Sequence, residues 1–154
     1  MNRAIQYRTF GAPEVLDIVD AAAPDPGEGE VRVSVRAAGL NPVDWKMFSG
    51  SFGGDQSKLP QGVAKDFAGV IDAVGDGVTE FAVGDEVLGS LRKAGQSDQP
   101  NGALADHLVA SVLDLTKKPS GLGFVDSASL GIPALTACGS LRALELVADD
   151  VIVV

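Results

Sequence analysis

The sequence is poor in the residues that build metal sites and disulfides. Among 154 residues it has one cysteine, Cys138, and one histidine, His107. A single cysteine excludes a disulfide within the chain, as is usual in a reducing cytoplasm. Zinc takes three or four ligands, usually with at least two from cysteine or histidine. We therefore expect no bound zinc, a small buried Cys138 and an ordinary hydrogen-bonded His107 in a strand.

Positive charge is also scarce. The chain has 12 lysines and arginines against 21 aspartates and glutamates, which gives a net charge of −9. This balance leaves no basic face for nucleic acid or for an anionic membrane surface. No apolar run approaches the length of a membrane span, and the first residues lack the apolar core of a signal peptide. We expect a cytoplasmic protein with no nucleic-acid partner and no membrane partner.

Glycine and proline, in contrast, are plentiful, with 19 and 8 residues. They punctuate short apolar segments, and Val31, Val33 and Val35 alternate with polar residues as in a half-buried strand. Many short strands separated by turns predict a mainly β fold, a partly open antiparallel barrel. The expected strands cover residues 4–7, 15–19, 31–37, 67–74, 85–88, 103–109 and 113–116.

The pattern changes after residue 124. Ala134, Cys138, Leu141 and Leu144 recur at helical spacing, which predicts a helix in this part of the chain. The unbroken β-branched run at 151–154 is typical of a central parallel strand that is buried on both faces.

A helix start is expected at Asn41. Asparagine is a good N-cap, Pro42 suits the first turn, and Asp44 complements the positive end of the helix dipole. Gly50 is expected to end this helix. Most other carboxylates stand at turns or on polar strand faces, so they are expected to be solvated.

Five segments, taken in order, resemble the medium-chain dehydrogenases/reductases. The resemblance implies a GroES-like catalytic domain over residues 1–124, followed over 125–154 by a connecting helix and the first strand of a truncated NAD(P)-binding domain. The segments are AAPDPGEGEVRVSV (22–35), AAGLNPVDWKMFSG (37–50), LPQGVAKDFAGVIDAVGDGVTEFAVGDEVLG (59–89), GALADHLV (102–109) and ASLGIPALTACGSL (128–141).

The resemblance also points to one branch. Zinc-dependent alcohol dehydrogenases carry Cys-His where this chain has Asn41-Pro42, and Gly-His-Glu where it has residues 64–66, Ala-Lys-Asp. The Asn-Pro-x-Asp form is similar to the zinc-free quinone oxidoreductase and zeta-crystallin branch. Many relatives carry tyrosine at the positions of Lys46 and Phe52, so a phenol acid is excluded there.

Membership of that branch implies an oxidoreductase. Hydride would pass from NADPH or NADH to a quinone or an α,β-unsaturated carbonyl without zinc, in an enzyme that forms a homodimer at full length. Asn41 would be catalytic and would bind the cofactor together with Thr136, which the resemblance places at the nicotinamide end. Lys46 would touch a cofactor phosphate or donate a hydrogen bond. By spacing alone, Asn41 and Asp44 indicate only a helix cap.

Two expectations concern the chain as a whole. The run at 151–154 would precede the Gly-rich turn that receives the pyrophosphate, so the 154 residues alone are expected neither to bind NAD(P)H tightly nor to turn over. The alternative function is a non-catalytic GroES-like binding or assembly module, or a structural crystallin-like protein. A Gly-rich turn encoded directly after residue 154 would favour the reductase.

Overall fold

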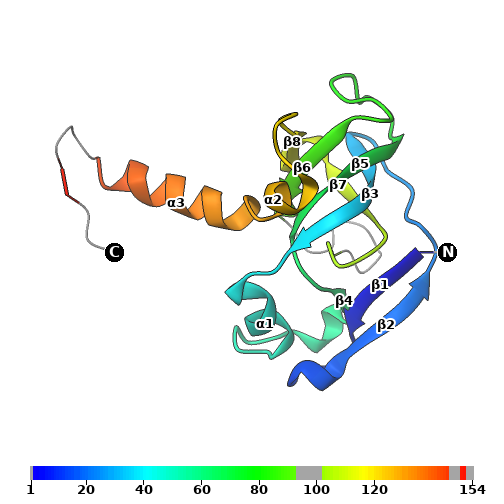
Figure 1. Cartoon of the computed structure of the whole chain (residues 1–154). Helices are drawn as coiled ribbons and strands as arrows, with labels where there is room; N and C mark the ends of the chain where they lie inside the picture. Colours follow the sequence, from blue (N-terminus) through cyan, green and yellow to red (C-terminus); the bar gives the residue numbers. More distant parts are fainter. Residues whose placement is uncertain (1, 93–101, 146–149, 152–154) are drawn as a thin grey trace.

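The computed structural model describes residues 2–92, 102–145 and 150–151, and its strands form two antiparallel sheets (Figure 1). The smaller sheet has the order β2-β1-β4, and the larger has the order β7-β3-β5-β6-β8. This arrangement confirms the mainly β, open antiparallel fold. The strands are β1 (Asn2–Tyr7), β2 (Leu16–Ala21), β3 (Glu30–Gly39), β4 (Gln61–Gly62), β5 (Asp66–Val74), β6 (Glu86–Ser90), β7 (His107–Ser111) and β8 (Leu115–Lys117).

The two sheets meet along β1. Ala4 forms an antiparallel bridge with Ala105, and the Ile5 N–H donates to the Leu104 carbonyl at 2.8 Å. The main core lies on one face of the larger sheet, because alternate residues of each strand point to that face. A second cluster of buried apolar residues, Tyr7, Phe48 and Val63, joins the end of the helix Pro42–Phe48 to the smaller sheet. The largest fully buried apolar members of the main core are Val31, Val33, Phe67, Ile71, Val87 and Leu108.

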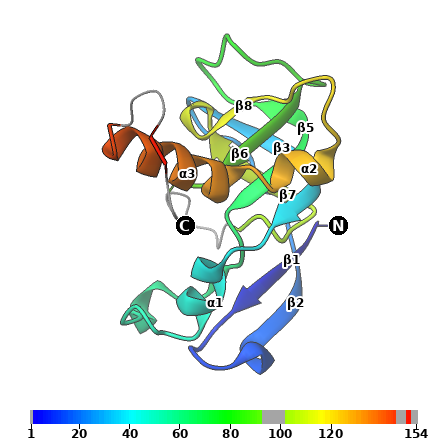
Figure 2. The same ribbon diagram turned by 60° about the vertical axis from the view of Figure 1, so that its left-hand side comes forward.

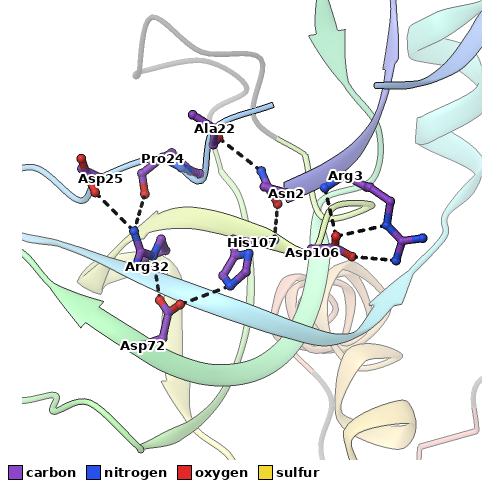
Figure 3. A network of polar contacts seen from close by, with 9 residues as sticks. All are labelled: Asn2, Arg3, Ala22, Pro24, Asp25, Arg32, Asp72, Asp106 and His107. Atoms are coloured by element: carbon purple, nitrogen blue, oxygen red, sulfur yellow. Dashed lines mark hydrogen bonds and ion pairs between the residues drawn. The ribbon is translucent and has the colours of Figure 1, made fainter. Parts of the chain in front are cut away.

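Polar contacts also fasten the start of the chain to the larger sheet (Figure 3). The Asp72 carboxylate pairs with Arg32 Nε at 2.8 Å and with His107 Nε2 at 3.2 Å. The backbone N–H of His107 donates to Asn2 Oδ1 at 2.9 Å. His107 is thus a strand residue with ordinary partners, as predicted.

Three α-helices and three short 3₁₀ turns complete the described fold. Helix α2 packs against β3 and β5, whereas α3 contacts β5 and β6 near its start and then projects away from the sheets (Figures 1 and 2). None of the helices in the described residues has the length and apolar character needed to cross a bilayer. The helices are α1 (Pro42–Phe48), α2 (Phe124–Ala128) and α3 (Gly131–Ala143), and the 3₁₀ turns are Pro13–Val15, Gln56–Lys58 and Val112–Asp114.

Several elements differ from the sequence prediction. The expected strand at 113–116 begins only at Leu115, because the Ser111 hydroxyl accepts a hydrogen bond from the Leu113 N–H and turns the chain. The strand expected over 103–109 begins at His107. The prediction of a buried Cys138 is wrong: the side chain is exposed, because α3 projects away from the strands that the structure describes (Figure 1). The strand predicted at 151–154 falls mainly on residues 152–154, which lie outside the described residues.

Candidate functional site

The junction between β3 and α1 places Asn41. Its backbone is extended (φ −127°, ψ 159°), and Pro42 opens the helix behind it. Asp44 closes a capping box, in which its Oδ2 accepts a hydrogen bond from the Asn41 N–H at 2.7 Å. The helix start predicted from the sequence is confirmed, and Gly50 follows the helix in the left-handed region at φ +77°.

The side chain of Asn41 reaches a second element. Its Nδ2 donates to Asp66 Oδ2 at 2.8 Å. Asp66 opens β5 in the middle of the larger sheet, where it pairs with Gly39 on β3 and Ser90 on β6, and it is fully buried. The amide of Asn41 is therefore held against a buried carboxylate of the sheet.

The same carboxylate oxygen reaches the start of α3. The Ile132 N–H donates to Asp66 Oδ2 at 2.8 Å. Leu130, at the N-cap of α3, offers no side-chain cap, so the carboxylate of β5 accepts one of the free N–H groups of the first turn. One oxygen atom thus joins the first turn of α1 to the first turn of α3.

Two of the three predicted site residues, Asn41 and Thr136, belong to the segments that Asp66 joins. Thr136 is exposed and follows Ile132 by four residues, about one turn or a rise of about 6 Å along α3. Asn41 and the helix that carries Thr136 are therefore brought together through Asp66. Lys46 lies on α1, with its Nζ 5.8 Å from the centroid of the Trp45 ring.

A strained turn delivers Asp66 to its position. Ala64 has φ +66°, a left-handed conformation that costs a residue with a Cβ about 1 kcal/mol. Backbone hydrogen bonds hold the turn: the Ala103 N–H donates to the Ala64 carbonyl at 2.9 Å, and the Leu91 N–H donates to the Lys65 carbonyl at 3.0 Å. The direction in which β5 begins is fixed by these contacts.

Two carboxylates, Asp44 and Asp66, are hydrogen-bonded to Asn41, and the charge of Asp66 affects the pKa of Asp44. Burial is the main cause that raises the pKa of Asp44, and the charge of Asp66 acts in the same direction. The hydrogen bond from the Asn41 N–H and the charge of Lys65 act in the opposite direction. Since burial is the largest of these effects, the ionised form of Asp44 is disfavoured in the folded protein.

Asp44→Asn should therefore gain stability relative to the natural protein as the pH rises. The raised pKa means that the folded state binds the Asp44 proton more tightly than the unfolded state, so this contribution is present below about pH 4 and is lost as pH rises through the folded pKa. An amide oxygen can still accept from the Asn41 N–H. Urea unfolding of both proteins at about pH 4 and about pH 7 measures the difference. A difference that is equal at both pH values would contradict the assignment.

Asp66 is the residue that sequence reasoning missed. It was not among the predicted site residues, yet it is fully buried. A signal was present, because an acidic residue directly precedes the apolar run Phe67–Ala68 where a strand enters the core. Within the residues that the structure describes, no group of three His, Cys, Asp or Glu side chains is arranged to hold a metal ion.

The chain has clear relatives among known proteins. Residues 27–123 match the alcohol dehydrogenase GroES-like domain. A quinone oxidoreductase from Lama guanicoe is 36% identical over 142 residues, which are 92% of this chain and 41% of the relative. The chain thus spans about two fifths of the length of that relative.

Solved structures show the same likeness. The quinone oxidoreductase from Coxiella burnetii superposes with a TM-score of 0.86 at 34% identity, over 97% of this chain and 47% of that one. A mycobacterial protein solved in complex with NADPH superposes with a TM-score of 0.81 at 30% identity, over 96% of this chain and 42% of that one.

Proposed function

The chain belongs to the alcohol dehydrogenase GroES-like family, in the quinone oxidoreductase branch of the medium-chain dehydrogenases/reductases, and from this membership we propose that it forms the substrate side of an NAD(P)H-dependent reductase. The observation that carries the proposal is the identity of 36% with a quinone oxidoreductase over 92% of the chain. The reaction is reduction of a quinone or an α,β-unsaturated carbonyl without zinc.

The proposal divides the chain into two parts. Residues 1–124, which hold both sheets, form the catalytic GroES-like domain. Residues 125–154, which include α3, form the connection to the nucleotide-binding domain and its first strand. In this division Asp66 belongs to the first part and its partner Ile132 to the second, so their hydrogen bond joins the two.

The residues present fit the nicotinamide end of the cofactor. Asn41 is half-buried at a strand-to-helix junction and Thr136 is exposed on α3, so an amide and a hydroxyl are available as neutral hydrogen-bonding groups. Such groups suit a carboxamide, whereas the net charge of −9 does not suit a diphosphate. We assign Asn41 to catalysis and cofactor binding, Thr136 to the nicotinamide end, and the cation of Lys46 to a phosphate or an outer hydrogen bond.

The nicotinamide supplies a hydride when it is bound. The residues of this chain orient the two reactants and stabilise negative charge on the substrate oxygen through hydrogen-bond donors, which take the place of a metal ion. Asn41 is suited to this task because one N–H of its amide donates to Asp66 before any ligand arrives, which holds the amide in place and leaves its second N–H to donate to a ligand. A donor held in advance costs no reorganisation when charge develops.

Asn41→Ala and Thr136→Val test this proposal in the protein that carries the chain. We expect Asn41→Ala to lower kcat/KM at least about tenfold, which corresponds to about 1.4 kcal/mol of transition-state stabilisation. Thr136→Val should raise the KM for NADPH. The assay follows NADPH oxidation with 1,4-benzoquinone and, separately, with but-3-en-2-one, and repeating it with EDTA should leave the rate unchanged.

Measurements of stability and of kinetics together can contradict the proposal. Asn41→Ala also removes a hydrogen bond to a buried carboxylate, so its unfolding free energy should fall by about 1–3 kcal/mol whatever its catalytic role. A loss of stability with unchanged kinetics in both variants would leave Asn41 and Thr136 outside the site. Loss of activity with EDTA would contradict a zinc-free reaction.

A further inference from the structure

We propose that Asp66 is a positioning residue, which fixes the amide of Asn41 and the first turn of α3 relative to each other. The proposal rests on the proposed function, in which Asn41 and Thr136 line the nicotinamide end. The observation behind it is that Asp66 Oδ2 accepts hydrogen bonds from both Asn41 Nδ2 and the Ile132 N–H, each at 2.8 Å.

The burial of this carboxylate is costly for the fold. Asp66 is fully buried, and within the described residues its Oδ1 has no hydrogen-bond partner. A buried carboxylate without a cation partner costs several kcal/mol in desolvation, and an apolar side chain of similar volume often stabilises such a site better. What the carboxylate supplies, and an apolar residue cannot, is one acceptor shared by two donors from distant segments.

The carboxylate also decides which way the amide of Asn41 faces. Asp66 Oδ2 accepts from Asn41 Nδ2, so the NH₂ of Asn41 faces the carboxylate and its carbonyl oxygen faces away. The flipped amide would bring its oxygen against the Asp66 oxygen. Asp66 therefore fixes which groups of Asn41 are presented to a ligand.

The second donor matters because α3 has little else to hold it. Its side chains Leu135 and Leu141 are 65% and 49% exposed, and Leu144, which follows the helix, is 56% exposed. Its contacts with the sheets lie near its start, at β5 and β6. The bond between Asp66 and Ile132 thus sets the direction in which α3 leaves the sheet, and with it the place of Thr136.

Two substitutions separate positioning from charge. Asp66→Ala removes both hydrogen bonds. Asp66→Asn can keep both, because one oxygen accepts both bonds and an amide carbonyl can take its place, with the NH₂ on the side of the unpartnered Oδ1. Asp72→Ala is the matched control, because Asp72 lies on β5 like Asp66 and its carboxylate contacts Arg32 and His107 rather than Asn41 or α3.

The experiment has two readouts on the protein that carries this chain. In ¹H–¹⁵N spectra, the Asn41 side-chain amide and the Ile132 backbone amide should be shielded from exchange in the natural protein and in Asp66→Asn, but not in Asp66→Ala. With NADPH and 1,4-benzoquinone, well below the unfolding temperature, kcat/KM should fall at least about tenfold in Asp66→Ala. It should stay within about threefold in Asp66→Asn and be unchanged in Asp72→Ala.

Other results would overturn the proposal. Unchanged kcat/KM in a folded Asp66→Ala would show that the carboxylate positions nothing that the reaction needs. If Asp66→Ala does not fold, a tenfold loss in Asp66→Asn with both amides still protected would show that charge, rather than positioning, is required. A natural protein that does not oxidise NADPH would overturn the proposed function alone, and the two amide signals would then decide whether Asp66 holds both segments.

Discussion

Replacing Gly131 with alanine should destabilise the protein by about 2–4 kcal/mol. Gly131 is the first residue of α3, and a Cβ placed there would lie 2.3 Å from Asp66 Oδ1 and 2.4 Å from its Cγ. Distances below 3.0 Å require a shift of one group. The Asp66 carboxylate is short, fully buried and bonded to two donors, so it cannot move without breaking those bonds.

The loss has two sources. Forcing an extra methyl group into a packed site costs about 1–3 kcal/mol, and losing a hydrogen bond to a charged group costs about 1.5–3 kcal/mol. Helix propensity acts the other way, because alanine is favoured over glycine by about 1 kcal/mol within a helix. The steric and hydrogen-bond costs together exceed this gain.

Gly139→Ala provides the control in the same helix. Among the described residues nothing lies within 4 Å of a Cβ at this position, so only the helix propensity should change, and the variant should gain about 0.5–1 kcal/mol. Urea unfolding of both variants measures the two effects with opposite signs. If Gly131→Ala matched Gly139→Ala, the close packing of α3 against Asp66 would be refuted.

Local features of the fold could be predicted from the sequence because local chemistry decides them. Asn41, Pro42 and Asp44 supply a cap, a fixed φ and an acceptor within four residues, and the helix begins there. The alternation of Val31 and Val33 with polar residues likewise marks β3, where both valines are fully buried.

The candidate site depends on contacts that the sequence separates widely. Asp66 is 25 residues from Asn41 and 66 residues from Ile132, and neither spacing carries a periodic signal. The resemblance to a family led to Asn41 and Thr136, but the carboxylate between their segments follows only from the pairing of β5 with β3. The exposure of Cys138 was missed for a similar reason, since helical spacing does not tell whether a sheet covers that face.

Asn41→Asp should produce a protein whose stability depends steeply on pH. The substitution places a second carboxyl where the Asn41 amide now lies 2.8 Å from the Asp66 oxygen. Two carboxylates this close cannot both ionise without strong repulsion, so the pKa of the new carboxyl at position 41 should lie well above its usual range. While protonated, it can donate an O–H to Asp66 in place of the amide N–H.

The sign of the effect follows from that raised pKa. The folded variant binds the extra proton more tightly than the unfolded chain, so near-natural stability is present at low pH and is lost as pH rises through the folded pKa. Relative to the natural protein, we expect a deficit of about 1.5 kcal/mol at about pH 5, where the unfolded carboxyl is already ionised, and of about 3 kcal/mol or more at about pH 8. The lower pH stays above the isoelectric point of about 4.4, where a net charge keeps the protein soluble.

Adding Asp66→Asn to Asn41→Asp should restore much of the stability at about pH 8, because it removes the charge that faces the new carboxyl. The rescue should be partial. In the natural protein one Asp66 oxygen accepts hydrogen bonds from both donors, whereas in the double variant the group at that place is either the amide oxygen, which can accept from the Ile132 N–H, or the NH₂, which can donate to the carboxylate at position 41. Urea unfolding of the natural protein, both single variants and the double variant at the two pH values gives the coupling energy directly. An Asn41→Asp deficit that is the same at both pH values, or that Asp66→Asn fails to reduce, would mean that these two side chains do not face each other in the folded protein.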